Sequence, residues 1–133
     1  MKLTKNMKNG EIFDLATNLL EAFPRIDGEE DAKTYPIKVL FYLRKNIKNL
    51  TELAQDIETA RVEIIKRYGV EDKDNPGQFK FETDEKVESA NKEFTELFNL
   101  EQEVTIYTIP LDAFNDMQLT EKQMDAIMDM IEE

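Results

Sequence analysis

The chain contains no cysteine and no histidine, and Ser89 is its only serine. Without cysteine it has no disulfide framework and no thiolate nucleophile or metal ligand, which is compatible with a reducing cytosol. Without histidine it lacks the commonest general base and the commonest metal ligand. These absences argue against serine, cysteine and zinc hydrolases. Any catalysis would have to rest on carboxylates, lysines or tyrosines, so the sequence favours a protein that is not an enzyme.

Long apolar runs are also missing. The basic N-terminus, residues 1–9, is followed by an apolar segment that Asp14 and Glu21 interrupt. We therefore expect no signal peptide and no transmembrane span, and a protein that stays in the cytoplasm of the cell that makes it. The length of 133 residues suits one domain, residues 1–133, and a hydrophobic fraction of 41% supports a small core.

Charge is distributed unevenly along the chain. The formal net charge is −12, yet residues 32–51 carry five basic residues and no acidic one. Residues 101–133 carry nine acidic residues and one basic residue. One interpretation is that this asymmetry orients subunits head to tail or steers a basic partner to the acidic end. The other is that the two regions neutralise each other within one fold.

The basic stretch does not predict nucleic-acid binding. Its Lys38, Arg44, Lys45 and Lys48 lack interleaved exposed aromatic residues, and the whole domain is strongly acidic. A nucleic acid would therefore meet overall repulsion. We expect these side chains to pair with acidic residues of the same protein.

One apolar stripe dominates the pattern. From Leu40 to Tyr68 the apolar residues recur in steps of three and four, and only Arg61 interrupts them. With Gly69 as its C-terminal cap, this spacing predicts a helix over residues 37–68. At about 1.5 Å per residue, such a helix spans roughly 48 Å and cannot bury its stripe without a partner. We expect Arg61 to reach the surface or to meet a carboxylate on a neighbouring helix, and the long helix itself indicates a scaffold or binding protein.

Shorter elements surround this helix in the prediction. They are a helix over residues 10–23 capped by Asn9, a loop over residues 24–35, a third helix that begins after Thr83, and a last helix opened by a capping box of Thr120 and Gln123. The third helix has an expected buried face of Val87, Ala90, Phe94, Leu97 and Phe98.

The strands are short. Residues 103–109 are rich in β-branched side chains and form the best strand, and residues 78–82 are its expected partner. The predicted fold class is therefore α+β, mostly α. A long central helix packs with two or three shorter helices and a small two-stranded sheet.

Residues 72–83 match a calcium-binding loop at three of its positions. The fifth position, however, is Pro76, which offers no side-chain oxygen, and the twelfth is Thr83 where calcium needs a bidentate glutamate. A plain turn before a strand is the favoured interpretation. We expect no metal, no cofactor and no small-molecule substrate.

Residues near the C-terminus form the candidate partner-binding site: Asp125, Met128, Asp129, Glu132 and Glu133. The two aspartates lie one helical turn apart, a spacing that suits a divalent cation, a basic docking partner or a solvated outer face. The solvated face would lie opposite an apolar face of Met124, Ile127, Met128 and Ile131. Four of the six methionines fall in the last 17 residues, and methionine serves both adaptable interfaces and core packing. We expect the C-terminal third to carry binding and the first three helices to fold without it.

The order and spacing of several short patterns resemble a family of small uncharacterised proteins encoded by tailed bacteriophages and prophages. The patterns are Lys8-Asn9-Gly10-Glu11-Ile12-Phe13, Leu19-Leu20, Pro36-Ile37-Lys38-Val39, Lys45-Asn46-Ile47-Lys48, Ile65-Lys66-Arg67-Tyr68-Gly69, Glu103-Val104-Thr105-Ile106, Leu119-Thr120 and Met130-Ile131-Glu132-Glu133. They cover most of the chain. The resemblance implies a phage source and a gene among those for virion, tail or late functions. The family offers no catalytic or binding motif to transfer.

The leading functional hypothesis is a non-enzymatic protein-binding component of a bacteriophage, either part of the head or tail of the particle or used during its assembly. Its expected partner is another phage structural protein or a second copy of itself, with no nucleic acid and no membrane. It would lie in the cytoplasm of the infected bacterium or in the virion. The alternative is a phage-encoded inhibitor of a host nucleic-acid enzyme, with an acidic surface that imitates DNA. An enzyme that uses carboxylates and a metal is a third, weaker hypothesis.

The burial of the long stripe is directly testable. Ile47→Asp or Ile57→Asp would place a carboxylate in an apolar contact without a partner. We expect either change to unfold the protein or abolish its assembly, as measured by thermal denaturation and by oligomeric state. A variant that matches the wild type in both measurements would show that the stripe is exposed.

Overall fold

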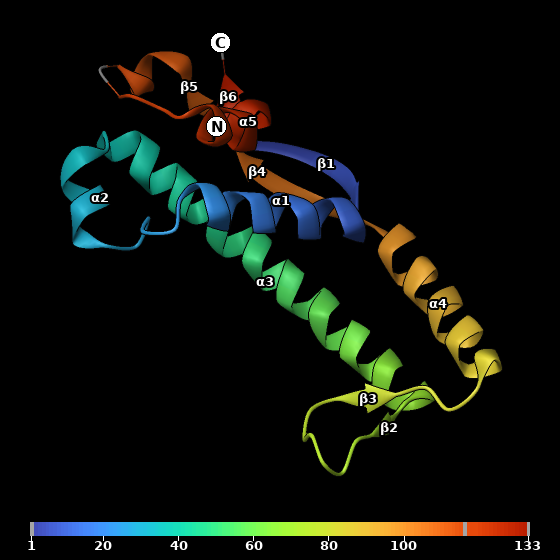
Figure 1. The fold of residues 1–133 in the computed structure, drawn as a ribbon. Helices are drawn as coiled ribbons and strands as arrows, with labels where there is room; N and C mark the ends of the chain where they lie inside the picture. Colours follow the sequence, from blue (N-terminus) through green and yellow to red (C-terminus); the bar gives the residue numbers. More distant parts are fainter. Residues whose placement is uncertain (1, 116, 133) are drawn as a thin grey trace.

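The computed structural model describes residues 2–115 and 117–132. Its longest element is helix α3 (Ile37–Tyr68), which confirms the predicted bounds. Helix α1 (Asn9–Ala22) packs against α3, and so does helix α4 (Asp84–Asn99). Figure 1 shows α1 beside the first half of α3 and α4 beside the second half. The expected α+β fold, mostly α and built on a long central helix, is confirmed.

The apolar stripe of α3 is buried along its length. Its buried members are Leu40, Leu43, Ile47, Leu50, Ile57 and Ile64. Arg61, which interrupts the stripe, is half-exposed and forms an ion pair with Glu58 on its own helix. Its Nε donates to Glu58 Oε2 at 2.8 Å, and its Nη2 donates to Glu58 Oε1 at 2.6 Å. The expected carboxylate partner is therefore present, although it lies on the same helix. The pair holds the Glu58 pKa below its usual value.

The strand pairing differs from the prediction. Strand β4 (Glu101–Tyr107) pairs antiparallel with β1 (Lys2–Lys8), in a register that joins Lys2 to Tyr107 and Lys8 to Glu101. The expected pairing of residues 78–82 with residues 103–109 is wrong. Strand β3 (Phe79–Lys80) pairs instead with β2 (Val70–Glu71), because the turn between them brings the two segments together at the far end of α3 (Figure 1).

Several local expectations also need correction. Asn9 does not cap α1: it is the first helical residue and is buried, and its side chain donates to the Leu97 carbonyl at 2.9 Å and accepts from Gln102 at 2.7 Å. The predicted loop at residues 24–35 contains a short helix, α2 (Glu29–Thr34). The cap of α4 is confirmed, since the Lys86 amide donates to Thr83 Oγ1 at 3.2 Å.

The buried face of α4 is smaller than expected. Ala90 is buried and Phe94, Leu97 and Phe98 are half-buried, but Val87 is exposed. Val87 lies in the first turn of the helix, next to the hairpin end of the molecule. The end of α4 packs more closely, and there Phe98 meets Phe13 of α1 edge to face with 6.4 Å between ring centres.

The C-terminal segment consists of several short elements rather than one continuous helix. After β5 (Ile109–Pro110) and a 3₁₀ turn (Leu111–Phe114), helix α5 (Glu121–Ile127) begins at the expected capping box of Thr120 and Gln123. A second 3₁₀ turn (Met128–Met130) follows, and β6 (Ile131–Glu132) then pairs parallel with β5. The predicted last helix therefore ends at residue 127.

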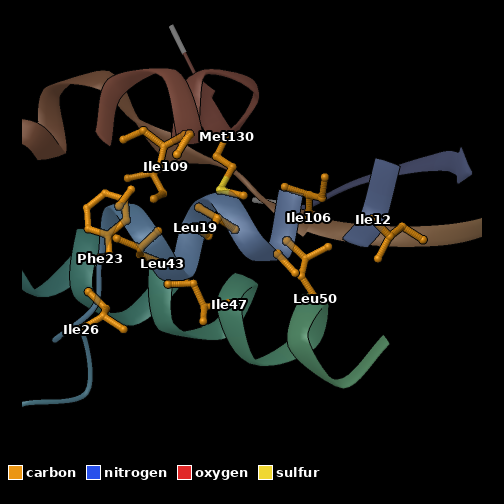
Figure 2. Close-up of a cluster of buried hydrophobic side chains, with 14 of the residues drawn as sticks. Ile12, Leu19, Phe23, Ile26, Leu43, Ile47, Leu50, Ile106, Ile109 and Met130 are labelled. Atoms are coloured by element: carbon orange, nitrogen blue, oxygen red, sulfur yellow. The ribbon is translucent and has the colours of Figure 1, made fainter. Parts of the chain in front are cut away.

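The core gathers side chains from α1, α3, β4 and the C-terminal segment (Figure 2). Leu19 of α1 and Phe23, which directly follows this helix, face Leu43 of α3, and Ile106 and Met130 complete the cluster from the opposite side. All five are almost completely buried. Elements from both ends of the chain thus share one core, which fits a single domain.

Asn46 is the polar centre of this core, with only 1% of its surface exposed. Its Nδ2 donates to the Tyr107 carbonyl at 2.8 Å, and its Oδ1 accepts from the Tyr107 amide at 2.7 Å. Nδ2 also lies 3.4 Å from the Met130 sulfur. One side chain on α3 therefore fixes the end of β4 and contacts the C-terminal 3₁₀ turn.

Asn46→Ala should destabilise the fold strongly. It removes both side-chain hydrogen bonds to Tyr107 in a buried place, so we expect a loss of about 2–4 kcal/mol in the free energy of unfolding, measured by urea denaturation. Asn49→Ala, three residues further along α3, is the matched control, with an expected change of about 0.5 kcal/mol or less. Equal effects of the two substitutions would contradict this role for Asn46.

Candidate functional site

The structure separates the candidate C-terminal residues. Asp125 on α5 and Asp129 on the following 3₁₀ turn are both exposed, and Met128 has 57% of its surface exposed. Glu132 is half-buried, and its Oε2 accepts a hydrogen bond from Thr108 Oγ1 at 2.9 Å. This contact links β6 to the residue before β5, so Glu132 contributes to the fold. Glu133 lies outside the described residues. Three of the five predicted residues thus face solvent together on a short segment.

The methionines near the C-terminus have two different roles. Met130 is buried in the core, and Met117 is partly buried against it. Met124 and Met128, by contrast, are exposed, which contradicts the expected apolar face of the last helix. We call Met124, Asp125, Met128 and Asp129 the acidic surface.

The segment that carries the acidic surface is anchored in the core. Ala126, Ile127 and Met130 are buried, and Gln123 Nε2 donates to the Ala22 carbonyl at 3.1 Å. Lys122 also forms an ion pair with Glu21 of α1, with 3.6 Å between Nζ and Oε2. This packing argues against the expectation that the first three helices fold without the C-terminal third.

A second exposed surface lies on the first turns of α3, in the basic stretch that one interpretation of the charge asymmetry assigned to head-to-tail contact. Ile37 and Phe41 have 75% and 56% of their surfaces exposed. Together with Arg44, Lys45 and Lys48 they line a hollow of about 460 Å³, with buried Leu40 behind them. We call these five side chains the basic surface.

Aromatic rings hold the basic surface in place. The Lys45 ammonium lies 4.4 Å from the centre of the Tyr107 ring and 5.5 Å from that of Phe41. Tyr107 in turn stacks on Tyr42 with 6.2 Å between ring centres, and Phe41 meets Tyr42 edge to face at 5.3 Å. The expectation that this basic stretch lacks exposed aromatic residues is therefore wrong.

The basic stretch is only partly neutralised by the protein itself. Arg44 donates to the Ile26 carbonyl at 2.8 Å and lies 3.8 Å from Asp27. Within the described part of the chain, Lys45 and Lys48 form no ion pair, and neither do Asp125 and Asp129. The expected pairing of the basic stretch with the protein's own acids therefore holds for Arg44 alone among the residues of the basic surface.

A signal for the basic surface was present in the sequence. Ile37, Phe41, Lys45 and Lys48 follow helical spacing of their own, beside the buried stripe rather than on it. A helix with apolar residues on two faces has more apolar surface than one packing partner covers. The stronger Leu40 to Tyr68 stripe concealed this second pattern.

The loop at residues 72–78 is a turn, as expected. Asp72 Oδ1 accepts from the Asp74 amide at 3.0 Å, and Asp72 Oδ2 accepts from the Asn75 side chain at 3.3 Å. The Nζ of Lys80 also lies 3.6 Å from Asp72 Oδ2. These contacts, the amide of Asp74 first, lower the pKa of Asp72. Gly77 supplies the positive φ of +89° that the turn needs.

The residues that the structure describes contain neither a cluster that could hold a metal nor a helix that could span a membrane. Among residues 2–115 and 117–132, no three carboxylates gather closely enough to hold a metal ion. No helix in the same part of the chain combines the length and apolarity that a bilayer crossing requires. Comparison of the chain with protein-family models, curated proteins and solved structures returned no match.

Removal of the C-terminal segment should unfold the protein. A chain that ends at Leu119 loses Ala126, Ile127 and Met130 from the core, and we expect the free energy of unfolding to fall by about 4 kcal/mol or more. Urea denaturation followed by circular dichroism measures this change. The matched control is Met124→Ser/Met128→Ser, which alters exposed residues of the same segment and should shift stability by about 0.5 kcal/mol or less. A truncated chain as stable as the wild type would contradict the role in the core.

Proposed function

We propose that this chain is a non-enzymatic, protein-binding component of a bacteriophage, built into the particle or used during its assembly. The observation that carries the proposal is the presence of two exposed apolar groups, Ile37 with Phe41 and Met124 with Met128. The first group lies beside Lys45 and Lys48, and the second is followed in sequence by Asp125 and Asp129. Exposed apolar side chains with a charged rim are typical of protein interfaces. The phage assignment rests on the sequence resemblance.

The distribution of titratable groups also favours a binding role. Among the groups that the structure describes, Glu58, Arg61, Tyr68 and Asp72 have shifted pKa values. A local contact explains each shift. Glu58 and Arg61 form an ion pair, a side-chain hydrogen bond with Glu93 raises the pKa of Tyr68, and the backbone amide of Asp74 lowers that of Asp72. They are spread over the second half of α3 and the hairpin, and they do not converge as catalytic groups do.

The inhibitor hypothesis has less support. A protein that imitates DNA needs negative charge along one continuous exposed face. Here the first turns of α3 present Lys45 and Lys48 without a carboxylate partner among the described residues, so a basic groove on a host enzyme would meet repulsion there. The acidic surface at residues 124–129 is better suited to a local contact with a basic patch on another protein.

The proposal predicts incorporation that depends on the acidic surface. Asp125→Lys/Asp129→Lys should reduce the amount of the protein in purified phage particles or assembly intermediates by about tenfold, a change of roughly 1.4 kcal/mol in binding. Quantitative mass spectrometry of particles from infected bacteria measures it. Both aspartates are exposed, so stability should stay close to that of the wild type.

The matched control is Glu88→Lys/Glu96→Lys, which makes the same change in net charge on exposed positions of α4. This variant should be incorporated like the wild type. Absence of the wild-type protein from particles and from every assembly intermediate would contradict the proposed function. Equal loss in both charge variants would contradict the role of the acidic surface.

A further inference from the structure

The basic surface has a chemistry that defines what would cover it. Its centre is apolar, since Ile37 and Phe41 are the two exposed apolar side chains of the hollow. Its rim is cationic, with Lys45 and Lys48 free of carboxylate partners within the described residues. The complementary occupant is therefore a segment with flexible apolar side chains at its centre and carboxylates beside them.

The acidic surface of the same chain has this composition. Met124 and Met128 are exposed one helical turn apart, and Asp125 and Asp129 follow each of them directly. Methionine is unbranched and adapts to an irregular hollow, while the two aspartates supply negative charge opposite in sign to Lys45 and Lys48. The aspartates also have no ion-pair partner in the part of the chain that the structure describes.

We propose that the basic surface of one copy binds the acidic surface of a second copy, so that the chain assembles head to tail. This inference rests on the proposed function and names the partner as the protein itself. The two surfaces are different, so the contact is heterologous: a bound pair still presents one free acidic surface on one copy and one free basic surface on the other. Repetition of the contact gives a closed ring or an open filament rather than a symmetric dimer.

The net charge of −12 opposes association of identical copies, but over a limited range. At about 0.15 M salt the screening length is about 8 Å, so charges farther apart than this contribute little. Between the two surfaces the local charges have opposite sign and attract. The geometry thus favours one relative orientation of two copies, because any contact between two acidic surfaces places carboxylates against carboxylates.

The test uses two variants of the full chain that each destroy one surface. Ile37→Ser/Phe41→Ser removes the apolar centre of the basic surface, and Met124→Ser/Met128→Ser that of the acidic surface. Because these side chains are exposed, both variants should keep the melting temperature of the wild type. Sedimentation velocity over a concentration series up to about 1 mM, a range that detects weak contacts, gives the mass of each species.

We expect the wild type to grow beyond a dimer as its concentration rises, and each variant alone to remain a monomer. An equimolar mixture of the two variants retains one intact basic and one intact acidic surface, on different molecules. The mixture should therefore form a 1:1 complex and stop there. A wild type that stays monomeric throughout, or a mixture that stays monomeric, would overturn the proposal. Dimers of either variant alone would also overturn it, because they require a symmetric contact.

Charge variants test the electrostatic part of the argument. Lys45→Glu/Lys48→Glu should weaken association of the full chain by at least about tenfold. Lys73→Glu/Lys92→Glu makes the same change in net charge on exposed positions elsewhere and should leave association nearly unchanged. Equal weakening by both would show that net charge alone acts and would overturn the assignment of the basic surface. A monomeric protein that still enters phage particles would refute head-to-tail assembly and leave the proposed function intact.

Discussion

The fold depends on one constraint, which is the need to cover the apolar stripe of a 32-residue helix. Among the elements that the structure describes, no other is long enough to cover it alone, since α1 has 14 residues and α4 has 16. The chain solves this with two helices placed in succession, α1 along the first half of α3 and α4 along the second (Figure 1). The hairpin of β2 and β3 follows from this arrangement, because the chain must reverse at the end of α3 before α4 can return.

The same arrangement brings both ends of the chain to the first half of α3. β4 continues from α4, and β1 precedes α1, so the two strands meet antiparallel beside α1. Tyr107 then reaches Asn46, whose side-chain amide forms hydrogen bonds with the backbone amide and carbonyl of Tyr107. The Met130 sulfur contacts the same Asn46 side chain. A buried amide that bonds two specific backbone groups fixes the position of β4 along α3 more tightly than apolar packing alone, because a shift of one residue would leave those groups unpaired.

Local patterns predicted the local structure, and tertiary contacts decided the rest. The bounds of α3, the Thr83 cap and the Thr120–Gln123 capping box depend on residues close in sequence, and all three are confirmed. β1 escaped prediction because only Leu3 and Met7 are apolar in it, and its register exists only through β4. Of the candidate site, the exposure of Asp125 and Asp129 was foreseeable, whereas the exposure of Met128 was not, since its spacing from Met124 and Ile131 indicated one buried apolar face.

Contacts within the protein preorganise the side chains of the basic surface. Lys45 extends over Phe41 and Tyr107, and Tyr107 is itself held by Asn46 through its backbone and by Tyr42 through its ring. Asn46, the polar centre of the core, thus orders Tyr107, whose ring supports the half-buried Lys45. Binding of an acidic segment would fix fewer free rotamers on this surface than on a set of mobile lysines, and a smaller entropy loss leaves more of the contact energy as affinity. The constraint that organises the core therefore also shapes the surface that we assign to assembly.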